Sequence, residues 1–182
     1  MQGFRPASRR AAGTITEAMV VEADISVVAR AQGMALQNMR VVMRAAQRHS
    51  AQIEKQCGVS GAQLWVMQEL LERPGLRMGE LAGKMSIHQT TASNLVDALV
   101  KKAYVRKARD QPDQRVVTLT LTAEGQAVIA GAPQPARGLL PSALAQLDPD
   151  SLAHLNQGLN ALLAVVSPDD RQAGMQPFPF TM

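Results

Sequence analysis

Basic side chains gather in one stretch of this 182-residue chain, between residues 84 and 115. Seven Lys and Arg residues lie there beside three Asp residues, a formal charge of +4 that equals the net charge of the whole chain. A local positive charge on an otherwise neutral chain indicates a polyanion partner, and nucleic acid fits that description. From charge alone, a solvated basic face without a partner is an equal alternative.

The end of this basic stretch has the pattern of a β-hairpin. The segment Lys107–Thr122 reads KARDQPDQRVVTLTLT, and its residues 110–114 favour a turn. Strand-like runs flank the turn at residues 104–109 and 115–121, and apolar and polar residues alternate in the second run. We therefore predict two strands joined by a charged tip.

Other kinds of chemistry find no support in the residue types. Cys57 is the only cysteine, which excludes an internal disulfide and a thiolate metal cluster, and the three histidines lie far apart. Because there is no nucleophile–base pair, metal-ligand spacing or phosphate loop, we expect neither an enzyme nor a cofactor. No apolar run approaches the roughly 18 residues of a membrane span, and the first residues carry arginines but no apolar stretch long enough for a signal peptide. We therefore expect a cytoplasmic protein without a membrane partner.

Helical segments precede the hairpin and must position it. Ser60 and Gln63 have the spacing of a capping box, which begins a helix that ends before Pro74. Two further helices, over 78–85 and 88–102, are joined by a short link, and Ala82 is small enough to let them cross closely. A helix-turn-helix followed by a β-hairpin makes a winged helix, predicted here over residues 58–121.

The flanking regions are predicted to be helical as well. Residues 1–23 are expected to be a flexible extension, 24–56 and 122–167 to form helices with apolar faces, and 168–182 to be a tail without periodicity. A second copy of the chain can cover these faces, which predicts a homodimer; folding back onto the same domain is the alternative. The predicted fold is mostly α with a small β-hairpin wing: a winged helix-turn-helix with N- and C-terminal dimerisation helices.

Residues 58–125 resemble the MarR family of bacterial transcription regulators. The resemblance runs through GVSGAQLWVMQELL, MGELAGKMSIHQTTASNLVDALVKKAYVRK and DQPDQRVVTLTLTAEG. It implies a homodimeric, sequence-specific regulator of double-stranded DNA, a repressor released by a small-molecule effector, on a pseudo-palindromic operator with half-sites about 10 bp apart. Two positions depart from the pattern: His88 replaces the usual Ser or Thr, and Ala103 replaces the usual Gly.

The second helix of the helix-turn-helix has the polar face that a major groove requires. If Ala92, Leu95, Val96 and Leu99 face the core, the other faces carry hydrogen-bonding side chains. The predicted DNA contacts of this helix are Gln89, Thr90, Thr91, Ser93, Asn94 and Lys101. Asp97 either accepts a hydrogen bond from cytosine or pairs with Lys101.

The resemblance also implies roles for the wing and for a ligand. In the wing, Arg115, supported by Lys107 and Arg109, contacts the minor groove or its phosphates, and Asp113 braces the arginines. A small aromatic effector would contact Met43, His49 and Trp65, although Met and Trp at helical spacing more often belong to the core. Two alternatives stay open: a redox sensor acting through Cys57, and an interaction module that does not bind DNA.

Overall fold

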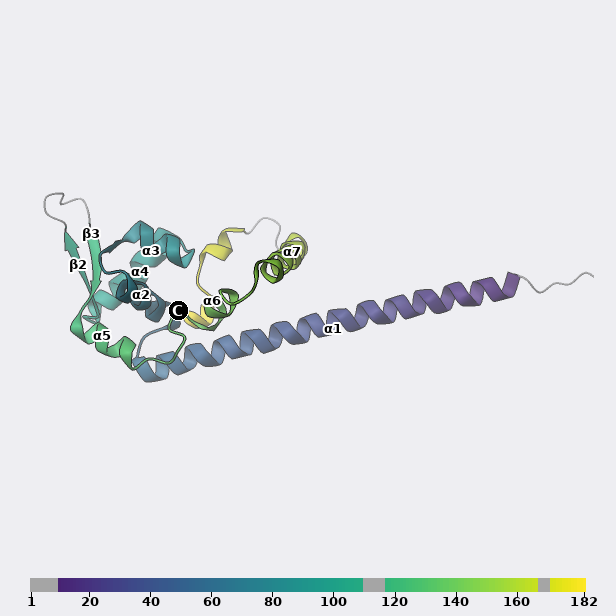
Figure 1. Ribbon diagram of the computed structural model, residues 1–182, viewed down its shortest axis with the longest axis horizontal. Coiled ribbons are helices and arrows are strands. Elements are labelled where there is room, and N and C mark those ends of the chain that lie inside the picture. The colour runs from purple at the N-terminus through teal and green to yellow at the C-terminus, as the bar shows by residue number, and fades with distance from the viewer. Residues whose placement is uncertain (1–9, 110–116, 167–170) are drawn as a thin grey trace, which may run out of the picture. The chain divides into compact units, whose positions relative to one another are not determined.

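A computed structural model describes the backbone of residues 10–109, 117–166 and 171–182 (Figure 1). The chain divides into two compact units, residues 1–44 and residues 45–182. Helix α1 (Arg10–Cys57) begins well before the predicted start at Asp24. No proline interrupts residues 10–23 and alanine recurs there, so nothing in the local sequence stops the helix. Gly58, at φ +64°, follows its last residue, which is the backbone conformation that commonly ends a helix.

The second unit contains the predicted winged helix. Its helices are α2 (Gly61–Glu72), α3 (Met78–Met85) and α4 (Gln89–Lys101), and they lie beside β2 (Val105–Arg109) and β3 (Val117–Leu121) (Figure 1). The mostly helical fold with a small antiparallel sheet confirms the predicted fold class. The capping box at the start of α2 is also present: the Gln63 amide donates to Ser60 Oγ over 3.3 Å, and Gln63 Oε1 accepts from the Ser60 amide over 3.1 Å.

The sheet has three strands in the order β1-β3-β2, one more than the sequence predicted. The additional strand, β1 (Leu76–Arg77), pairs antiparallel with β3 and places Leu76 opposite Leu119. Two residues are too few to show an alternating pattern, which explains why β1 was missed. On its other edge β3 pairs with β2, where Lys107 lies opposite Leu119. The hairpin is therefore attached to the loop that connects α2 and α3.

One hydrophobic core joins these helices and strands. Its most deeply buried members come from α2, β1, α3, α4 and β3: Leu64, Met67, Leu70, Leu76, Leu81, Leu99 and Leu119. The predicted core face of α4 is buried throughout. Ala82 is buried in the same cluster, and its carbonyl accepts a hydrogen bond from the Ile87 amide over 3.1 Å, which makes the turn between α3 and α4 tight.

The start of α5 (Ala123–Ala130) is fastened to the junction between α4 and β2. Thr122 caps α5 by accepting from the Gly125 amide over 3.0 Å, and its hydroxyl donates to the Ala103 carbonyl over 2.7 Å. A Cβ at Gly125 would lie 2.2 Å from the Tyr104 carbonyl oxygen, so only glycine fits there. Ala103 has φ +61°, the left-handed conformation in which an alanine is strained. The Leu-Thr-x-x-Gly sequence thus holds the wing against the helix-turn-helix.

Beyond α5 the chain continues with α6 (Leu139–Leu144), α7 (Pro149–Val166) and the 3-10 helices η1 (Arg171–Met175) and η2 (Pro179–Thr181). Pro141 lies in the first turn of α6, where its missing amide proton is not needed. Asp148 begins α7 as predicted, accepting from the Ser151 amide over 2.9 Å. The leucine face of α7 is exposed. Among the described helices, none is long and apolar enough to cross a membrane.

Candidate nucleic-acid interface and ligand cavity

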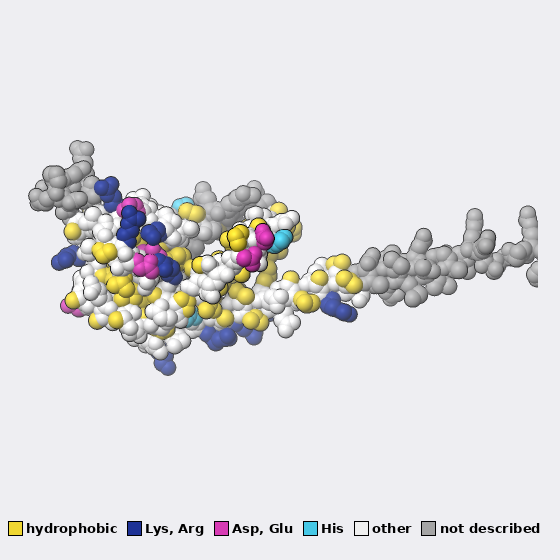
Figure 2. Space-filling view, viewed as in Figure 1, with side chains coloured by type: hydrophobic (Ala, Val, Ile, Leu, Met, Phe, Trp, Pro, Cys, Tyr) yellow, Lys and Arg dark blue, Asp and Glu magenta, His cyan; other side chains and the backbone are white. Residues whose placement is uncertain are grey.

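Helix α4 presents a polar surface because its apolar positions are held in the core. Gln89, Thr90, Asn94 and Lys101 are exposed, and Ser93 is half-exposed. Amide and hydroxyl side chains at these positions can donate to and accept from base edges, and Lys101 can neutralise a phosphate. Figure 2 shows Lys and Arg side chains interspersed with Asp and Glu over the part of the molecule that carries α2–α4.

Thr91 does not belong to that exposed surface. Its side chain is buried, and its hydroxyl donates to Gln176 Oε1 over 3.0 Å. The prediction of a DNA contact at Thr91 therefore needs correction. The partner lies 85 positions further along the chain, in a segment that showed no periodicity, so local sequence could not reveal it. The neighbouring N-cap, His88, makes no side-chain capping bond, and its amide donates to the Met175 carbonyl over 3.1 Å.

Asp97 forms an ion pair with the wing, in addition to its interactions with Ser93 and Lys101 of its own helix. Lys107 Nζ on β2 lies 2.5 Å from Asp97 Oδ1. The hydrogen bond from Lys107 lowers the pKa of Asp97, and the charge of Lys101 contributes further. The pair joins α4 to the hairpin at the surface. Lys107 must consequently exchange a carboxylate for a phosphate if it is to contact DNA.

The remaining wing residues lie partly outside the described part of the chain. Arg109 ends β2 opposite Val117, so the backbone places it at the start of the hairpin tip. Arg115 and Asp113 fall within residues 110–116, outside the described residues, and their predicted roles stay predictions. Arg106, which the sequence did not single out, is exposed on β2. The predicted wing contacts included Lys107 and Arg109, close to it in the sequence, but not Arg106.

A cavity of about 400 Å³ lies in the second unit, on the side of α2 that carries Trp65. It is lined by the C-terminal part of α1, α2, the turn between α3 and α4, α6 and the C-terminal residues. Among the lining side chains are Ile53, Leu139, Leu144, Phe178 and Phe180. His49 and Trp65, two of the three predicted ligand contacts, line it, and Met43 does not. His49 Nε2 lies 3.0 Å from the Pro135 carbonyl oxygen. The volume suits a small molecule, and the walls are largely apolar.

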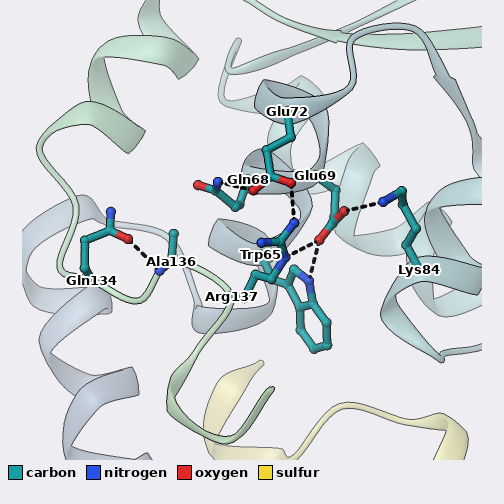
Figure 3. A network of polar contacts seen from close by, with 8 residues as sticks. All are labelled: Trp65, Gln68, Glu69, Glu72, Lys84, Gln134, Ala136 and Arg137. Atoms are coloured by element: carbon teal, nitrogen blue, oxygen red, sulfur yellow. Dashed lines mark hydrogen bonds and ion pairs between the residues drawn. The ribbon is translucent and has the colours of Figure 1, made fainter. Parts of the chain in front are cut away.

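A buried carboxylate connects this cavity to the helix-turn-helix (Figure 3). Glu69 on α2 is 2% exposed and accepts from Trp65 Nε1 over 3.0 Å and from Arg137 Nε over 2.6 Å. Lys84 Nζ on α3 lies 3.1 Å from its second oxygen. Arg137 also binds Glu72, which itself accepts from Gln68. Burial alone would raise the pKa of Glu69, but the hydrogen bonds from Arg137, Trp65 and Lys84 together lower it.

Glu69 and Arg137 were not predicted from the sequence. Glu69 follows Trp65 by four positions on a helix, the spacing at which two side chains meet, and this was an available signal. Arg137 offered none, since it lies between prolines and 68 positions away from Glu69. Both Trp65 and Arg137 line the cavity, so its occupant would touch the same side chains that hold Glu69.

Cys57 lies at the last position of α1 and is half-buried. Burial raises the pKa of its thiol, which lowers the thiolate fraction and with it the reactivity toward oxidants. In the described residues, no group of three or more His, Cys, Asp and Glu side chains could hold a metal ion.

Comparison with known proteins agrees with this architecture. Residues 57–116 match the model of the MarR family. Two proteins of Bacillus subtilis (strain 168) are 34% identical to this chain: YsmB, an uncharacterized HTH-type transcriptional regulator, over 90 residues, and MdtR, an HTH-type transcriptional repressor, over 83 residues. The matches cover 45% and 43% of this chain, and 62% and 53% of those relatives. The segment that matches the MarR family model lies almost wholly within the winged helix, and it makes up about a third of the chain.

A solved structure shares the fold. The crystal structure of a MepR-like protein complexed with pseudoligands superimposes with a TM-score of 0.51 at 20% identity, over 78% of this chain and 96% of the other. At this identity the likeness concerns the backbone arrangement alone. Since the relatives are matched over little more than half their length, what this chain binds has to be argued from its own residues.

Proposed function

We propose that this protein is a homodimeric, sequence-specific DNA-binding transcriptional regulator, and that it is a repressor released by a small aromatic molecule. The observation that carries the proposal is the polar face of α4, which is exposed beside a basic hairpin because the apolar face of α4 is packed in the core. Gln89, Thr90, Ser93, Asn94 and Lys101 would contact the major groove. The wing would contact the minor groove or its phosphates through Arg115, with Lys107 and Arg109 in support and Asp113 as a brace.

Duplex binding tests the proposal directly. Fluorescence anisotropy would be measured with the protein's own upstream intergenic DNA at two salt concentrations, with a scrambled duplex as competitor. A DNA-binding protein shows affinity that falls steeply with salt, because each phosphate contact releases counterions. Absence of binding even at low salt would favour the alternative, an interaction module.

Two variants of α4 and a control distinguish sequence-specific base contacts from electrostatic contacts with phosphates. Asn94→Ala should weaken binding to the operator more than to the scrambled duplex, since a base contact is worth about 1–3 kcal/mol. Lys101→Ala should weaken both and lower the salt slope by about one unit. Lys55→Ala removes the same charge from an exposed position near the end of α1 and serves as the control. Equal losses for Lys101→Ala and Lys55→Ala would contradict an interface on α4.

The homodimer is proposed from the apolar faces that the described chain leaves uncovered. On α7, Leu155, Leu159, Leu162 and Leu163 are between 39% and 52% exposed. On α1, considered by itself, large apolar side chains are exposed as well: Val27, Val28, Met34, Leu36, Met39, Val41 and Val42. Leucines repeated along one helix face cost free energy in water, and a second copy offers the same face to cover them.

Sedimentation tests the dimer. Leu159→Asp and Leu162→Asp together should shift the protein toward the monomer, because two carboxylates would enter an apolar interface. Gln157→Asp adds a carboxylate to the same helix at an exposed polar position and should leave the dimer intact. A wild-type protein that sediments as a monomer at all concentrations would exclude this part of the proposal.

The effector is proposed to bind in the cavity and to carry no charge. Arg137 is the guanidinium on the cavity wall, and Glu69 and Glu72 already neutralise it. Trp65 is the only tryptophan, so its fluorescence reports on the cavity. Phenol should change this fluorescence saturably and benzoate should not. Stronger binding of benzoate would show that Arg137 exchanges its carboxylate partners for a ligand.

A further inference from the structure

The C-terminal segment, residues 174–182, contains aromatic side chains that take part in the tertiary structure. It carries Phe178 and Phe180, two of the chain's three phenylalanines. Their rings are stacked with centroids 5.3 Å apart and an angle of 14° between the planes. Both rings line the cavity that His49 and Trp65 also line.

The seat of this segment is built from buried groups of α1 and α2. Ser50 on α1 is 6% exposed, and its hydroxyl donates to the Phe180 carbonyl over 2.6 Å. This bond satisfies a hydroxyl that lies out of contact with water while the segment is in place. Gly61 opens α2 beside Thr181: a Cβ at Gly61 would lie 3.6 Å from Thr181 Cβ and 3.1 Å from Ser50 Oγ. These contacts fix the outer end of the segment over the cavity.

The inner end of the same segment is bonded to the first turn of α4. The Met175 carbonyl accepts from the His88 amide, and Gln176 accepts from the buried Thr91 hydroxyl. A carbonyl oxygen at this end of a helix is also favoured by the helix dipole. Only one residue, Pro177, separates Gln176 from Phe178, so the rings that line the cavity and the bonds that hold α4 belong to one short unit.

We infer that the C-terminal segment is the lid of the cavity and that it couples the cavity to the recognition helix. An uncharged aromatic molecule would contact Phe178 and Phe180 on entering, and a ligand that moved these rings would draw Met175 and Gln176 away from His88 and Thr91. The first turn of α4 would lose two bonds, and DNA affinity would fall. The DNA step rests on the proposed function; the lid and its bonds to α4 do not.

The test uses the full chain with Phe178→Ala and Phe180→Ala combined, and Met182→Ala as a control at a 59% exposed position of the same segment. Acrylamide quenching of Trp65 reports on the closure of the cavity, and amide hydrogen exchange at His88 reports on the bond to Met175. In the double variant we expect the quenching constant to rise at least about twofold and exchange at His88 to quicken about tenfold. The control should match the wild type.

A second variant isolates the link to α4. Gln176→Ala removes the bond from Thr91 and leaves both phenylalanine rings in place, although Gln176 also lines the cavity. Exchange in the first turn of α4 should therefore quicken, while Trp65 quenching should rise much less than in the double variant. Wild-type quenching in the folded double variant would overturn the lid. Raised quenching with unchanged exchange at His88 would overturn the coupling.

These outcomes stay distinct from those of the DNA experiment. Neither quenching nor hydrogen exchange involves DNA. A wild-type protein that does not bind duplex DNA would therefore contradict the proposed function without affecting the inference that the segment is a lid. If DNA binds, the double variant should bind it about tenfold more weakly than the Met182→Ala control, in line with typical coupling free energies. An affinity equal to the control would exclude a regulatory role for the lid.

Discussion

Leu99 on α4 and Leu159 on α7 are both leucines on helices of the second unit, but their solvent exposure differs. Leu99 is 0% exposed and Leu159 is 41% exposed. Both belong to apolar faces with helical spacing, and both faces were recognised in the sequence. The difference shows that periodicity identifies a face to be buried, whereas the partner that buries it depends on the rest of the molecule.

This contrast extends to the two regions as a whole. In the winged helix, α2, β1, α3, α4 and β3 all contribute to one core, and that core orients the polar face of α4. Helix α7 has no buried residue, although leucine recurs along it. The winged helix thus holds most of the hydrophobic core, and α7 presents a surface for which a second copy is the proposed partner. Four pairs of substitutions examine this division.

The largest effect is expected from the leucines themselves. Leu99→Ala should lower the free energy of unfolding by about 4 kcal/mol, because it removes a buried side chain and leaves a cavity. Leu159→Ala should change the urea midpoint of the winged helix little and weaken self-association instead. Urea unfolding followed by Trp65 fluorescence and sedimentation measure the two quantities. Comparable losses of stability for both variants would mean that α7 belongs to the same cooperative core.

A glycine pair sharpens the contrast between crowded and open backbone. Gly125→Ala should destabilise the winged helix by about 3 kcal/mol, since its Cβ would collide with the Tyr104 carbonyl and force the backbone apart. Gly83→Ala, on α3 with no atom within 4 Å of the added Cβ, is the control and should raise stability by about 0.5–1 kcal/mol. Thermal unfolding would measure both; the same sign for both variants would contradict this packing.

The Glu69 network tests whether the core depends on charge. Because the folded-state pKa of Glu69 is lowered, its contribution is present above the unfolded pKa of about 4.3 and is lost as the pH falls through the folded pKa. Glu69→Gln should cost about 2 kcal/mol at pH 7, since Arg137 and Lys84 lose a charged partner but stay partly exposed. The variant should also lose less stability than the wild type between pH 5 and acid, as about one titrating carboxylate is gone.

The control for Glu69 is the exposed carboxylate Glu124 on α5. Glu124→Gln removes a charge from the first turn of a helix and should cost no more than about 0.5 kcal/mol. Parallel pH profiles of wild type and Glu69→Gln would show that the network contributes nothing to acid sensitivity.

The smallest expected effect lies at Ala103, between α4 and β2. Its φ of +61° strains an alanine, and Ala103→Gly should relieve that strain and stabilise the winged helix by about 0.5–1 kcal/mol. Ala98→Gly, within α4, is the matched control and should destabilise it by about 1 kcal/mol. A stability loss for Ala103→Gly would mean that chain entropy outweighs the strain.

The winged helix could be predicted because its signals are local. The capping box at Ser60, the bounds of α3, the apolar face of α4 and the start of α7 each depend on residues a few positions apart, and all appear in the structure. Hydrogen bonds to the nearest turn and a period of 3.6 are properties of a short segment, so they can be recognised without knowing the fold.

Only the tertiary structure decided which distant residues meet. In the structure, Thr91 is buried and hydrogen-bonded to Gln176, and Phe178 and Phe180 line the cavity. Asp97 forms an ion pair with Lys107, and Glu69 forms one with Arg137. The sequence by itself determined the elements and the faces they bury. The pairings between them follow from how the whole chain packs, since a contact across tens of residues leaves no mark in the local pattern of either partner.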